Sequence, residues 1–437
     1  MSALNGRLLA CFAGVALGAG VPACAGDGGA AQPATGMSVT NCLAIGGAMK
    51  DDNADLMKWM TLRKDTGKVV VIAYATSRAE GADTRMSARL EKFGWKGTAL
   101  LLPDVLKGAD ERKTAVEWLP HADLIFMTGG DQSRIMQRFK AAPDLRQALD
   151  YGMSHWATPV AGSSAGAAVM SNPMFTGGGS ESALAGSEAD DGEQDDPPAA
   201  APAKPGETMP ADAKPTKPAP RKGVQIGEGL GIVSPMIDTH FFARGRVGRL
   251  VAALEASKKP FGLGIDENRA VSITGGSMCT AIGDCGALLV DTRDLKREGG
   301  SRTGVRINLL SSGDRWDWPV DGQADKGVVS PRTLGQGAVA IDAPLLPQGS
   351  PPPSAWAKGV TLAMLKRLAA NPHYAQNAES EGFRVCISAD PDTRFGWSAE
   401  KPGALTVTNA RLEIYELTPA DRAERAARRA ATAKPKP

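Results

Sequence analysis

Residues 159–170, PVAGSSAGAAVM, decide the fold that this sequence predicts. The stretch opens as a short apolar strand, runs through Gly-x-Ser-x-Gly and continues in small residues suited to the start of a helix. A strand, a sharp turn and a helix in this order form a nucleophile elbow, which exposes its central serine at the tip of the turn. Ser164 is that central serine, and Ser163 is the rival nucleophile. A Gly/Ser-rich loop without chemistry is the alternative interpretation.

Apolar runs and helical patterns alternate in the chain before the elbow. The strands expected there are residues 42–47, 68–73, 98–102 and 124–127, and the helices between them are residues 54–62, 84–93, 110–119, 133–140 and 144–154. This alternation predicts an α/β fold with a doubly wound, mostly parallel sheet. Ligands of such sheets bind beyond the carboxyl ends of the strands, where Ser164 falls.

The pattern changes after the elbow. Residues 180–222 are rich in acidic residues and then in Pro, Ala and Lys, which predicts a disordered insertion that is either a lid or a solvated loop. Further on, strands are expected at residues 232–237, 261–265 and 305–310, a helix at 247–256, and a pair of strands, 270–274 and 286–291, around a hairpin. We expect a catalytic domain at 38–315, a small β-rich C-terminal accessory module at 316–420 and a basic, frayed tail at 421–437.

Composition excludes some classes of partner. The chain has 437 residues, 42% of them hydrophobic, and a formal net charge of +2. A nearly balanced charge gives no case for a nucleic-acid surface. Metal-ligand spacing with histidine is absent, so neither a metal nor a cofactor is expected. A homodimer is among the assemblies compatible with the sequence.

The first 25 residues read as an export signal, with Arg7 before an apolar run from residue 8 to 21 and small residues around Cys24. The apolar run is too short to span a bilayer stably. We expect a secreted or periplasmic protein. The alternative is a lipoprotein anchored through Cys24.

Four cysteines remain after the signal: Cys42, Cys279, Cys285 and Cys386. Cys279 and Cys285 flank what reads as a hairpin tip, so a disulfide between them is expected in an oxidising compartment. A pair of Cys42 and Cys386 would follow only by elimination. Four free buried thiols are the alternative.

A serine nucleophile needs a base, and the base needs an acid to orient it. The chain has four histidines, and only His240 ends a strand that can reach Ser164; the others are His121, His155 and His373. Acid candidates are Asp238, Asp266 and Glu267. The order nucleophile, His, acid departs from α/β-hydrolases and matches sheets of the class I glutamine amidotransferase-like, flavodoxin-like type.

These residues together resemble the cyanophycinases, within the serine peptidase family that also holds the aspartyl dipeptidases. The resemblance covers residues 42–316 outside the insertion and rests on motifs that occur in the family's order. They are Gly46-Gly47, Gly129-Gly130-Asp131-Gln132, Gly162-Ser163-Ser164-Ala165-Gly166-Ala167, Asp238-Thr239-His240-Phe241 with Arg244, Arg246 and Arg249, and Gly264-Ile265-Asp266-Glu267; Leu310-Ser311-Ser312-Gly313-Asp314 is a weaker match.

The resemblance implies a role for each matching position. Ser164 would be the nucleophile, His240 the base and Glu267 the orienting acid. The amides of the Gly129–Gly130 loop and of Ala165 would form the oxyanion hole. The substrate-binding residues implied are Gln132, Asp238, Thr239, Arg244 and Arg246, with the two arginines facing substrate carboxylates; Arg249 has a structural role as its alternative.

The implied reaction is hydrolysis of cyanophycin, a polyaspartate with arginine on each β-carboxyl, to β-aspartyl-arginine dipeptides through an acyl-enzyme. Two departures from the family's pattern stand out: Ser163 replaces a usual Thr, and Thr239 replaces a frequent Gln, which puts the preference for arginine-bearing units in doubt. The alternatives are an exopeptidase for short aspartyl peptides and a catalytically silent binding protein on the same scaffold.

Overall fold

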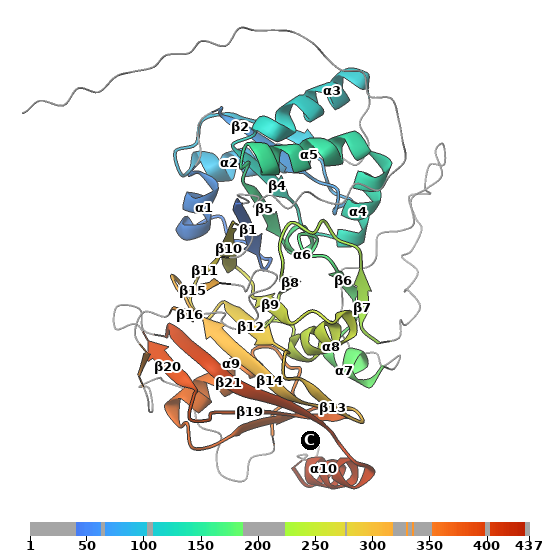
Figure 1. The fold of residues 1–437 in the computed structure, drawn as a ribbon, viewed down its shortest axis with the longest axis vertical. Coiled ribbons are helices and arrows are strands. Elements are labelled where there is room, and N and C mark those ends of the chain that lie inside the picture. The colour runs from blue at the N-terminus through green and yellow to red at the C-terminus, as the bar shows by residue number, and fades with distance from the viewer. Residues whose placement is uncertain are drawn as a thin grey trace, which may run out of the picture. The chain divides into compact units, whose positions relative to one another are not determined.

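The computed structural model describes residues 41–62, 66–102, 108–186, 223–275, 278–317, 329–330, 334–335, 352–397 and 403–432, all within one compact unit. Its strands form two large sheets and one small one (Figure 1). The predicted export signal and most of the predicted insertion lie outside these residues. Among the helices of the described ranges, none is long and apolar enough to cross a bilayer.

The first sheet contains the five parallel strands that the sequence predicts. In spatial order its strands are β16 (Val329–Ser330), β15 (Arg315–Asp317), β11 (Met278–Ile282), β10 (Ala270–Thr274), β1 (Asn41–Ile45), β5 (Val160–Ser163), β4 (Leu124–Met127), β2 (Lys68–Ile72) and β3 (Thr98–Leu102). The helices between its parallel strands are α1 (Ala54–Met60), α2 (Ala82–Glu91), α3 (Ala109–Trp118), η1 (Leu119–His121), α4 (Gln132–Ala141) and α5 (Pro143–His155).

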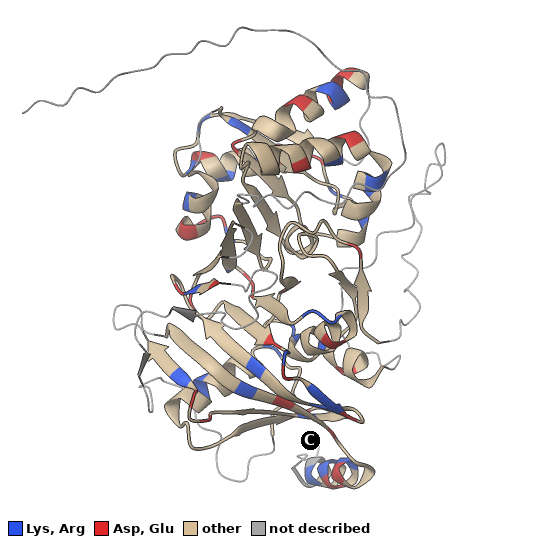
Figure 2. Ribbon diagram, viewed as in Figure 1, with Lys and Arg blue, Asp and Glu red and all other residues tan. Residues whose placement is uncertain are grey.

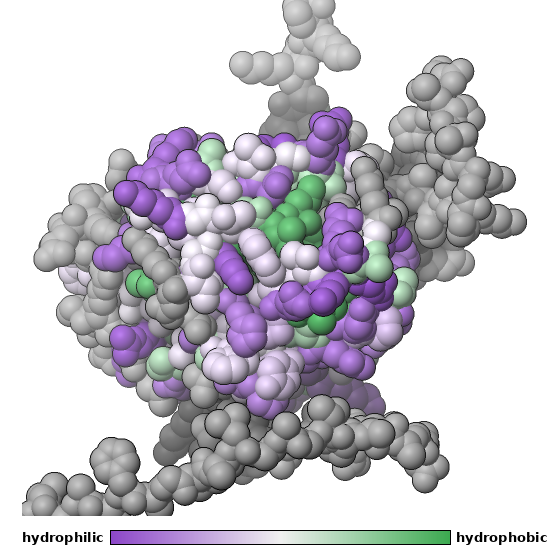
Figure 3. Space-filling model, turned by 90° about the horizontal axis from the view of Figure 1, so that it is seen from above, coloured by the Kyte–Doolittle hydropathy of each residue, from purple (hydrophilic) through white to green (hydrophobic). Residues whose placement is uncertain are grey.

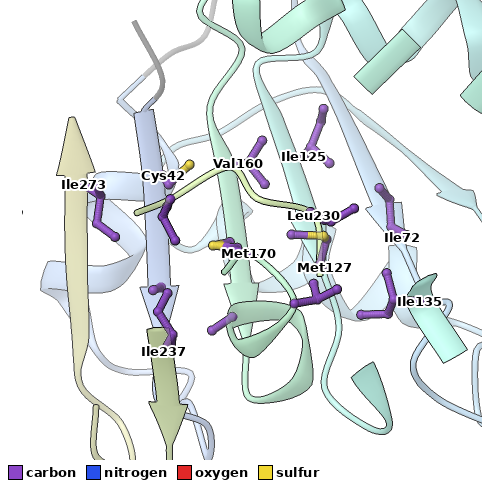
Figure 4. Packing of buried hydrophobic residues seen from close by; sticks show 14 of the residues in the cluster. Cys42, Ile72, Ile125, Met127, Ile135, Val160, Met170, Leu230, Ile237 and Ile273 are labelled. Carbon is purple, nitrogen blue, oxygen red and sulfur yellow. The ribbon is translucent and has the colours of Figure 1, made fainter. Parts of the chain in front are cut away.

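Side chains of β2 alternate between two hydrophobic clusters, because successive residues of a strand point to opposite faces. Val70 and Ile72 belong to one cluster, while Val69 and Val71 belong to the other. Figure 4 shows the first cluster, which gathers side chains from several parallel strands around Met170. Figure 2 shows that the charged residues of this part lie mainly on the helices. The sheet is therefore covered on both faces, as expected for parallel strands.

The second sheet is mostly antiparallel. Its strands, in spatial order, are β17 (Leu334–Gly335), β20 (Arg394–Trp397), β21 (Leu405–Glu416), β14 (Ser301–Leu310), β12 (Ala287–Asp291), β9 (Phe261–Ile265) and β8 (Met236–Thr239), while β13 (Lys296–Glu298), β18 (Gln376–Glu379) and β19 (Phe383–Ser388) pair at its side. Only β8 and β9 of these pairs are parallel. Strands from the predicted C-terminal module thus continue the sheet that carries β8 and β9.

The remaining helices differ in where they pack. Helix α6 (Ala165–Ala168) contacts β5, β1 and β4 of the first sheet and β8 of the second. Helices α8 (Val247–Ser257) and α9 (Val360–Ala370) pack on strands of the second sheet, and α7 (Ser180–Ala185) packs on α8. Helix α10 (Pro419–Thr432) follows the last strand, and the small sheet pairs β6 (Met174–Gly177) with β7 (Gln225–Gly227). Two expectations need correction here. The first residues of the expected disordered insertion form α7, and residues 421–432 of the expected frayed tail belong to α10.

The predicted hairpin around the cysteines is wrong. Strand β10 pairs with Met278–Ile282 instead of with residues 286–291, and the chain then crosses into the second sheet at β12. Cys279 therefore packs in a different hydrophobic cluster from Cys285. The Sγ of Cys285 accepts a hydrogen bond from the amide of Leu405 at 3.3 Å.

None of the four cysteines of the described ranges forms a disulfide, so neither predicted pair is present. Cys42 lies on β1 of the first sheet, and Cys386 lies on β19 of the second. Complete burial raises the pKa of the Cys42 thiol to about 12, which makes it unreactive at neutral pH.

The surface of the α/β part is polar with local apolar areas. Figure 3 shows this from above, with small apolar patches among hydrophilic side chains. Large hydrophobic side chains that are exposed include Leu62 at 70% and Trp156 at 48%. Scattered exposure of this kind is common on folded proteins and defines no site by itself.

Candidate active site

Ser164 lies at a sharp turn between β5 and α6. Its backbone has φ 54° and ψ −114°, a conformation that non-glycine residues rarely adopt outside functional turns. The turn requires small neighbours: a Cβ on Gly162 would lie 2.1 Å from the carbonyl oxygen of Gly166, and one on Gly166 would lie 2.2 Å from that of Met127. The predicted elbow has thus the geometry that exposes a serine side chain.

The side chains of Ser164, His240 and Glu267 form a hydrogen-bonded series. Ser164 Oγ lies 2.9 Å from His240 Nε2, and His240 Nδ1 lies 2.8 Å from Glu267 Oε1. The imidazole side chain is 12% exposed and the carboxylate 37% exposed, so the imidazole is largely shielded from solvent. This is the arrangement in which an acid fixes the imidazole and the imidazole takes a proton from the serine.

The end of β1 anchors all three segments of this series. Backbone carbonyls of residues 45–47 accept one hydrogen bond from each segment. The donors are the amides of Ser164, His240 and Asn268, at 2.9, 2.8 and 2.8 Å. The spacing of the three functional side chains is therefore set by one short run of backbone.

Asn268 adds a connection that the sequence did not suggest. Its φ is 55°, in the left-handed region that asparagine tolerates. Its Oδ1 accepts hydrogen bonds from the Lys50 amide and from Asn53 Nδ2, both at 3.0 Å. Asn53 is also the N-cap of α1. The turn that carries Glu267 is thus tied to the loop after β1.

The pKa of His240 is lowered from its ordinary value. Burial is the main cause, because a charged imidazolium loses hydration there, and the positive charges of Arg244 and Arg246 lower it further. The hydrogen bond to Glu267 acts in the opposite direction. The neutral imidazole that a general base requires is therefore favoured.

The Gly129–Gly130 loop lies beside the serine. A Cβ on Gly129 would lie 3.3 Å from Cβ of Ser164. Gly130 has φ 139°, and a Cβ there would lie 2.2 Å from the carbonyl oxygen of Ala75, so this position requires glycine. The oxyanion hole formed by the amides of Gly130 and Ala165 stays a prediction that this proximity supports.

The predicted substrate-binding residues differ in exposure. Gln132 is partly buried, and its Nε2 donates to the carbonyl oxygen of Phe175 at 2.6 Å. Arg246 is 4% exposed and donates to the carbonyl oxygen of Thr239 at 2.7 Å. Arg244 is partly exposed. Their contacts with substrate stay predictions, and the buried Arg246 is tied to the end of β8.

Asp238 forms a buried ion pair with Arg249. Its two carboxylate oxygens accept hydrogen bonds from Arg249 Nε at 2.8 Å and Nη2 at 2.6 Å, and Arg246 Nη1 lies 3.5 Å from Oδ1. Arg249 also donates to the carbonyl oxygen of Gly178. Asp238 is 1% exposed, so its carboxylate is engaged inside the protein. The partner of Arg249 is therefore Asp238, which lies two residues before His240, and this pairing fits the structural role given above as the alternative for Arg249.

Two other histidines contact aromatic rings instead of the serine. The ring of His155 stacks on Tyr151 with centroids 4.1 Å apart, and that of His121 meets Trp156 at 5.0 Å. The histidine beside Ser164 is His240, and its role as the base stays a prediction.

Residues 42–187 match the model of peptidase family S51, so this part of the chain is similar to that family. The cyanophycinase of Trichormus variabilis is 29% identical over 205 residues, which are 44% of this chain and 56% of that protein. The chain thus spans about half the length of this curated relative.

Other similar proteins extend over more of their own length. The cyanophycinase of Geminocystis herdmanii is 25% identical over 295 residues, 64% of this chain and 93% of that protein. Among solved structures, a peptidase from an acI-B1 Actinobacterium is 16% identical with a TM-score of 0.42, covering 65% of this chain and 98% of that one.

Proposed function

We propose that this protein is a serine peptidase that hydrolyses the aspartyl backbone of cyanophycin to β-aspartyl-arginine dipeptides through an acyl-enzyme. The observation that carries the proposal is the series from Ser164 Oγ through His240 to Glu267, with distances of 2.9 and 2.8 Å. Similarity to proteins named cyanophycinase supports the substrate class.

In the first step, Ser164 Oγ attacks a backbone carbonyl carbon of the polymer while His240 Nε2 takes the hydroxyl proton. The substrate oxygen becomes negative, and the amides of Gly130 and Ala165 would hold it. Glu267 keeps Nδ1 of the imidazole protonated and stabilises the imidazolium that forms.

In the second step, the carbon–nitrogen bond breaks. His240 gives its proton to the leaving amine, and an ester joins the remaining acyl group to Ser164. A water molecule then attacks this ester while His240 takes a proton from the water. The carboxylate product leaves, and the proton returns to Ser164 Oγ.

Substrate selection is assigned to the surrounding polar residues. Arg244 and Arg246 would attract substrate carboxylates, because a guanidinium offers paired donors and a permanent charge. Gln132 would contact the aspartyl part. Thr239 is 5% exposed, so we expect it to affect binding of the substrate's arginine side chain indirectly, through the positions of neighbouring residues.

Export belongs to the same proposal, with cleavage near residue 25 or lipidation at Cys24. Determining the N-terminus of the protein from the membrane and soluble fractions of the producing cell tests it. A processed soluble form supports export, a lipid-modified Cys24 supports the anchored form, and an intact Met1 in both fractions contradicts export.

The function is tested by mass spectrometry of products from insoluble cyanophycin, with wild type beside Ser164→Ala. Release of β-aspartyl-arginine by wild type alone is the expected result. Products from both proteins would contradict the assigned nucleophile. No product from either would reject cyanophycin and direct the assay to short aspartyl peptides.

A further inference from the structure

Residues 241–246 form the turn after the catalytic histidine, and this turn carries Arg244 and Arg246. One side of the turn is held by the second sheet, because Asp266 Oδ1 accepts a hydrogen bond from the amide of Ala243 at 2.9 Å. Asp266 thus stabilises the turn, whereas its neighbour Glu267 binds the imidazole. The other side of the turn faces the C-terminal part of the chain.

Residues 354–359, which precede α9, contact this other side through their backbone. The amide of Gly359 donates to the carbonyl oxygen of Phe242 at 2.7 Å. A Cβ on Gly245 would lie 2.0 Å from the carbonyl oxygen of Trp356, so the two backbones touch. Gly245 also has φ 60°, which favours glycine. Residues 354–359 lie outside the segment that matches the family model.

The Trp356 side chain fixes this contact to α7. Its indole N–H donates to Oε2 of Glu181, and Oε1 of the same carboxylate accepts from the amide of Gly382 at 2.6 Å. The indole also lies against α8, since a Cβ on Gly248 would lie 2.9 Å from the ring. Glu181 therefore joins two C-terminal segments to a helix of the catalytic region.

The residue before Glu181 completes the arrangement. Ser180 Oγ donates to the carbonyl oxygen of Gly245 at 2.8 Å and accepts from the amide of Arg249 at 3.2 Å. Helix α7 and residues 354–359 thus meet at Gly245, between the two arginines of the turn.

We propose that Trp356, hydrogen-bonded to Glu181, is a positioning residue of the active site that holds Arg244 and Arg246 in the pose needed to bind an acidic substrate. The role of Trp356 in substrate binding rests on the proposed function. Its role in placing the positive charges of Arg244 and Arg246 near His240 does not depend on that function, so the two roles can be tested separately.

The charge on the turn provides a readout without substrate. The charged groups that act on His240 are Arg244 and Arg246 from the turn and Glu267 from the β9–β10 connection. A looser turn moves the arginines away from the imidazole, while the hydrogen bond to Glu267 remains. The pKa of His240 should then rise toward its ordinary value.

The experiment uses the full chain and compares Trp356→Phe, Trp356→Ala and Glu181→Gln with wild type. Trp356→Phe keeps an aromatic ring and removes the indole donor, whereas Glu181→Gln leaves too few acceptor oxygens for both partners. Trp397→Phe is the matched control, because Trp397 lies on β20 with 48% exposure. The pKa of His240 is measured by NMR of ¹³C-labelled imidazoles, assigned with His240→Gln.

We expect the pKa of His240 to rise in all three test variants and to stay unchanged in Trp397→Phe. With an aspartyl peptide that wild type cleaves, KM should rise about tenfold in Trp356→Ala while kcat changes less than about threefold, the pattern of lost ground-state binding. Trp356→Phe and Glu181→Gln should show smaller shifts in the same direction.

An unchanged pKa of His240 in folded Trp356→Phe and Glu181→Gln would overturn the proposal. These two variants decide the question even if Trp356→Ala does not fold. Loss of kcat that only follows the unfolded fraction in thermal melts, with KM unchanged, would overturn it as well. If wild type cleaves no aspartyl peptide, the proposed function fails, and the titration of His240 still decides the positioning role.

Discussion

The imidazole of His240 lies directly against the α-carbon of Gly47. A Cβ built on Gly47 would lie 2.3 Å from both Cε1 and Nε2 of the ring, and Gly47 has φ 101°. Gly47→Ala should therefore displace the imidazole from Ser164 and lower kcat by about 10²-fold or more, the range of general-base catalysis. Steady-state kinetics on a cleaved aspartyl peptide measures the loss.

The matched control for this change is Gly275→Ala. Gly275 also has a positive φ, 64°, but among the described residues no atom beyond its chain neighbours lies within 4 Å of a Cβ built there. Both substitutions carry a similar backbone strain, so a common loss of stability is expected in both. Equal kcat values in the two variants would contradict the role of Gly47.

Glu267→Gln should lower kcat by about 10²- to 10⁴-fold, because an amide no longer enforces the productive tautomer of the base or stabilises the imidazolium. Glu267→Asp, which keeps the charge, should lose less. Circular dichroism confirms the fold, and kcat is compared under saturating substrate. A wild-type kcat in Glu267→Gln would contradict the role of Glu267 as the orienting acid. The other two acid candidates, Asp238 and Asp266, already accept hydrogen bonds from Arg249 and from the amide of Ala243.

The pH dependence of kcat/KM should show an acid limb below 6.5, the ordinary pKa of histidine, because burial and two arginines lower the pKa of His240. Activity requires the neutral imidazole and is lost as pH falls through this pKa. Arg244→Gln removes a positive charge that disfavours protonation, so the limb should move to higher pH. Arg244→Lys keeps the charge, so the acid limb of kcat/KM should stay near its original pH. The same acid limb in Arg244→Gln and Arg244→Lys would refute the electrostatic explanation.

Asp238→Asn and Arg249→Met should each destabilise the protein by about 3–5 kcal/mol. Each substitution removes one charge of a buried ion pair and leaves the other charge without its opposite partner. Denaturant unfolding monitored by tryptophan fluorescence gives the free energy of unfolding. The double variant should lose less than the sum of the single ones, because the partners are removed together. Additive losses would show that the two side chains act independently.

The three side chains of the candidate site could be predicted to come together because each follows a strongly apolar strand. Ser164 follows β5, His240 follows β8 and Glu267 follows β9, and carboxyl ends of strands carry the site in open α/β sheets. The parallel core was predictable for a related reason: runs such as residues 68–72 are apolar on both faces, which is typical of a covered parallel strand.

Pairing between distant segments could not be predicted from local patterns. Residues 270–274 and 286–291 both favour strands, but nothing in their composition shows that the chain changes sheets between Ile282 and Ala287. For the same reason the contacts of Asp238 with Arg249 and of Trp356 with Glu181 were missed: their partners are 11 and 175 positions away in the chain.

The central claim is that Ser164, activated by His240, is the nucleophile. Intact-mass analysis after reaction with a fluorophosphonate, followed by peptide mapping, tests it directly. We predict one adduct on Ser164 in wild type, none in Ser164→Ala and much slower labelling in His240→Gln. A single adduct on Ser163 or another residue, or equal labelling of wild type and Ser164→Ala, would contradict the account.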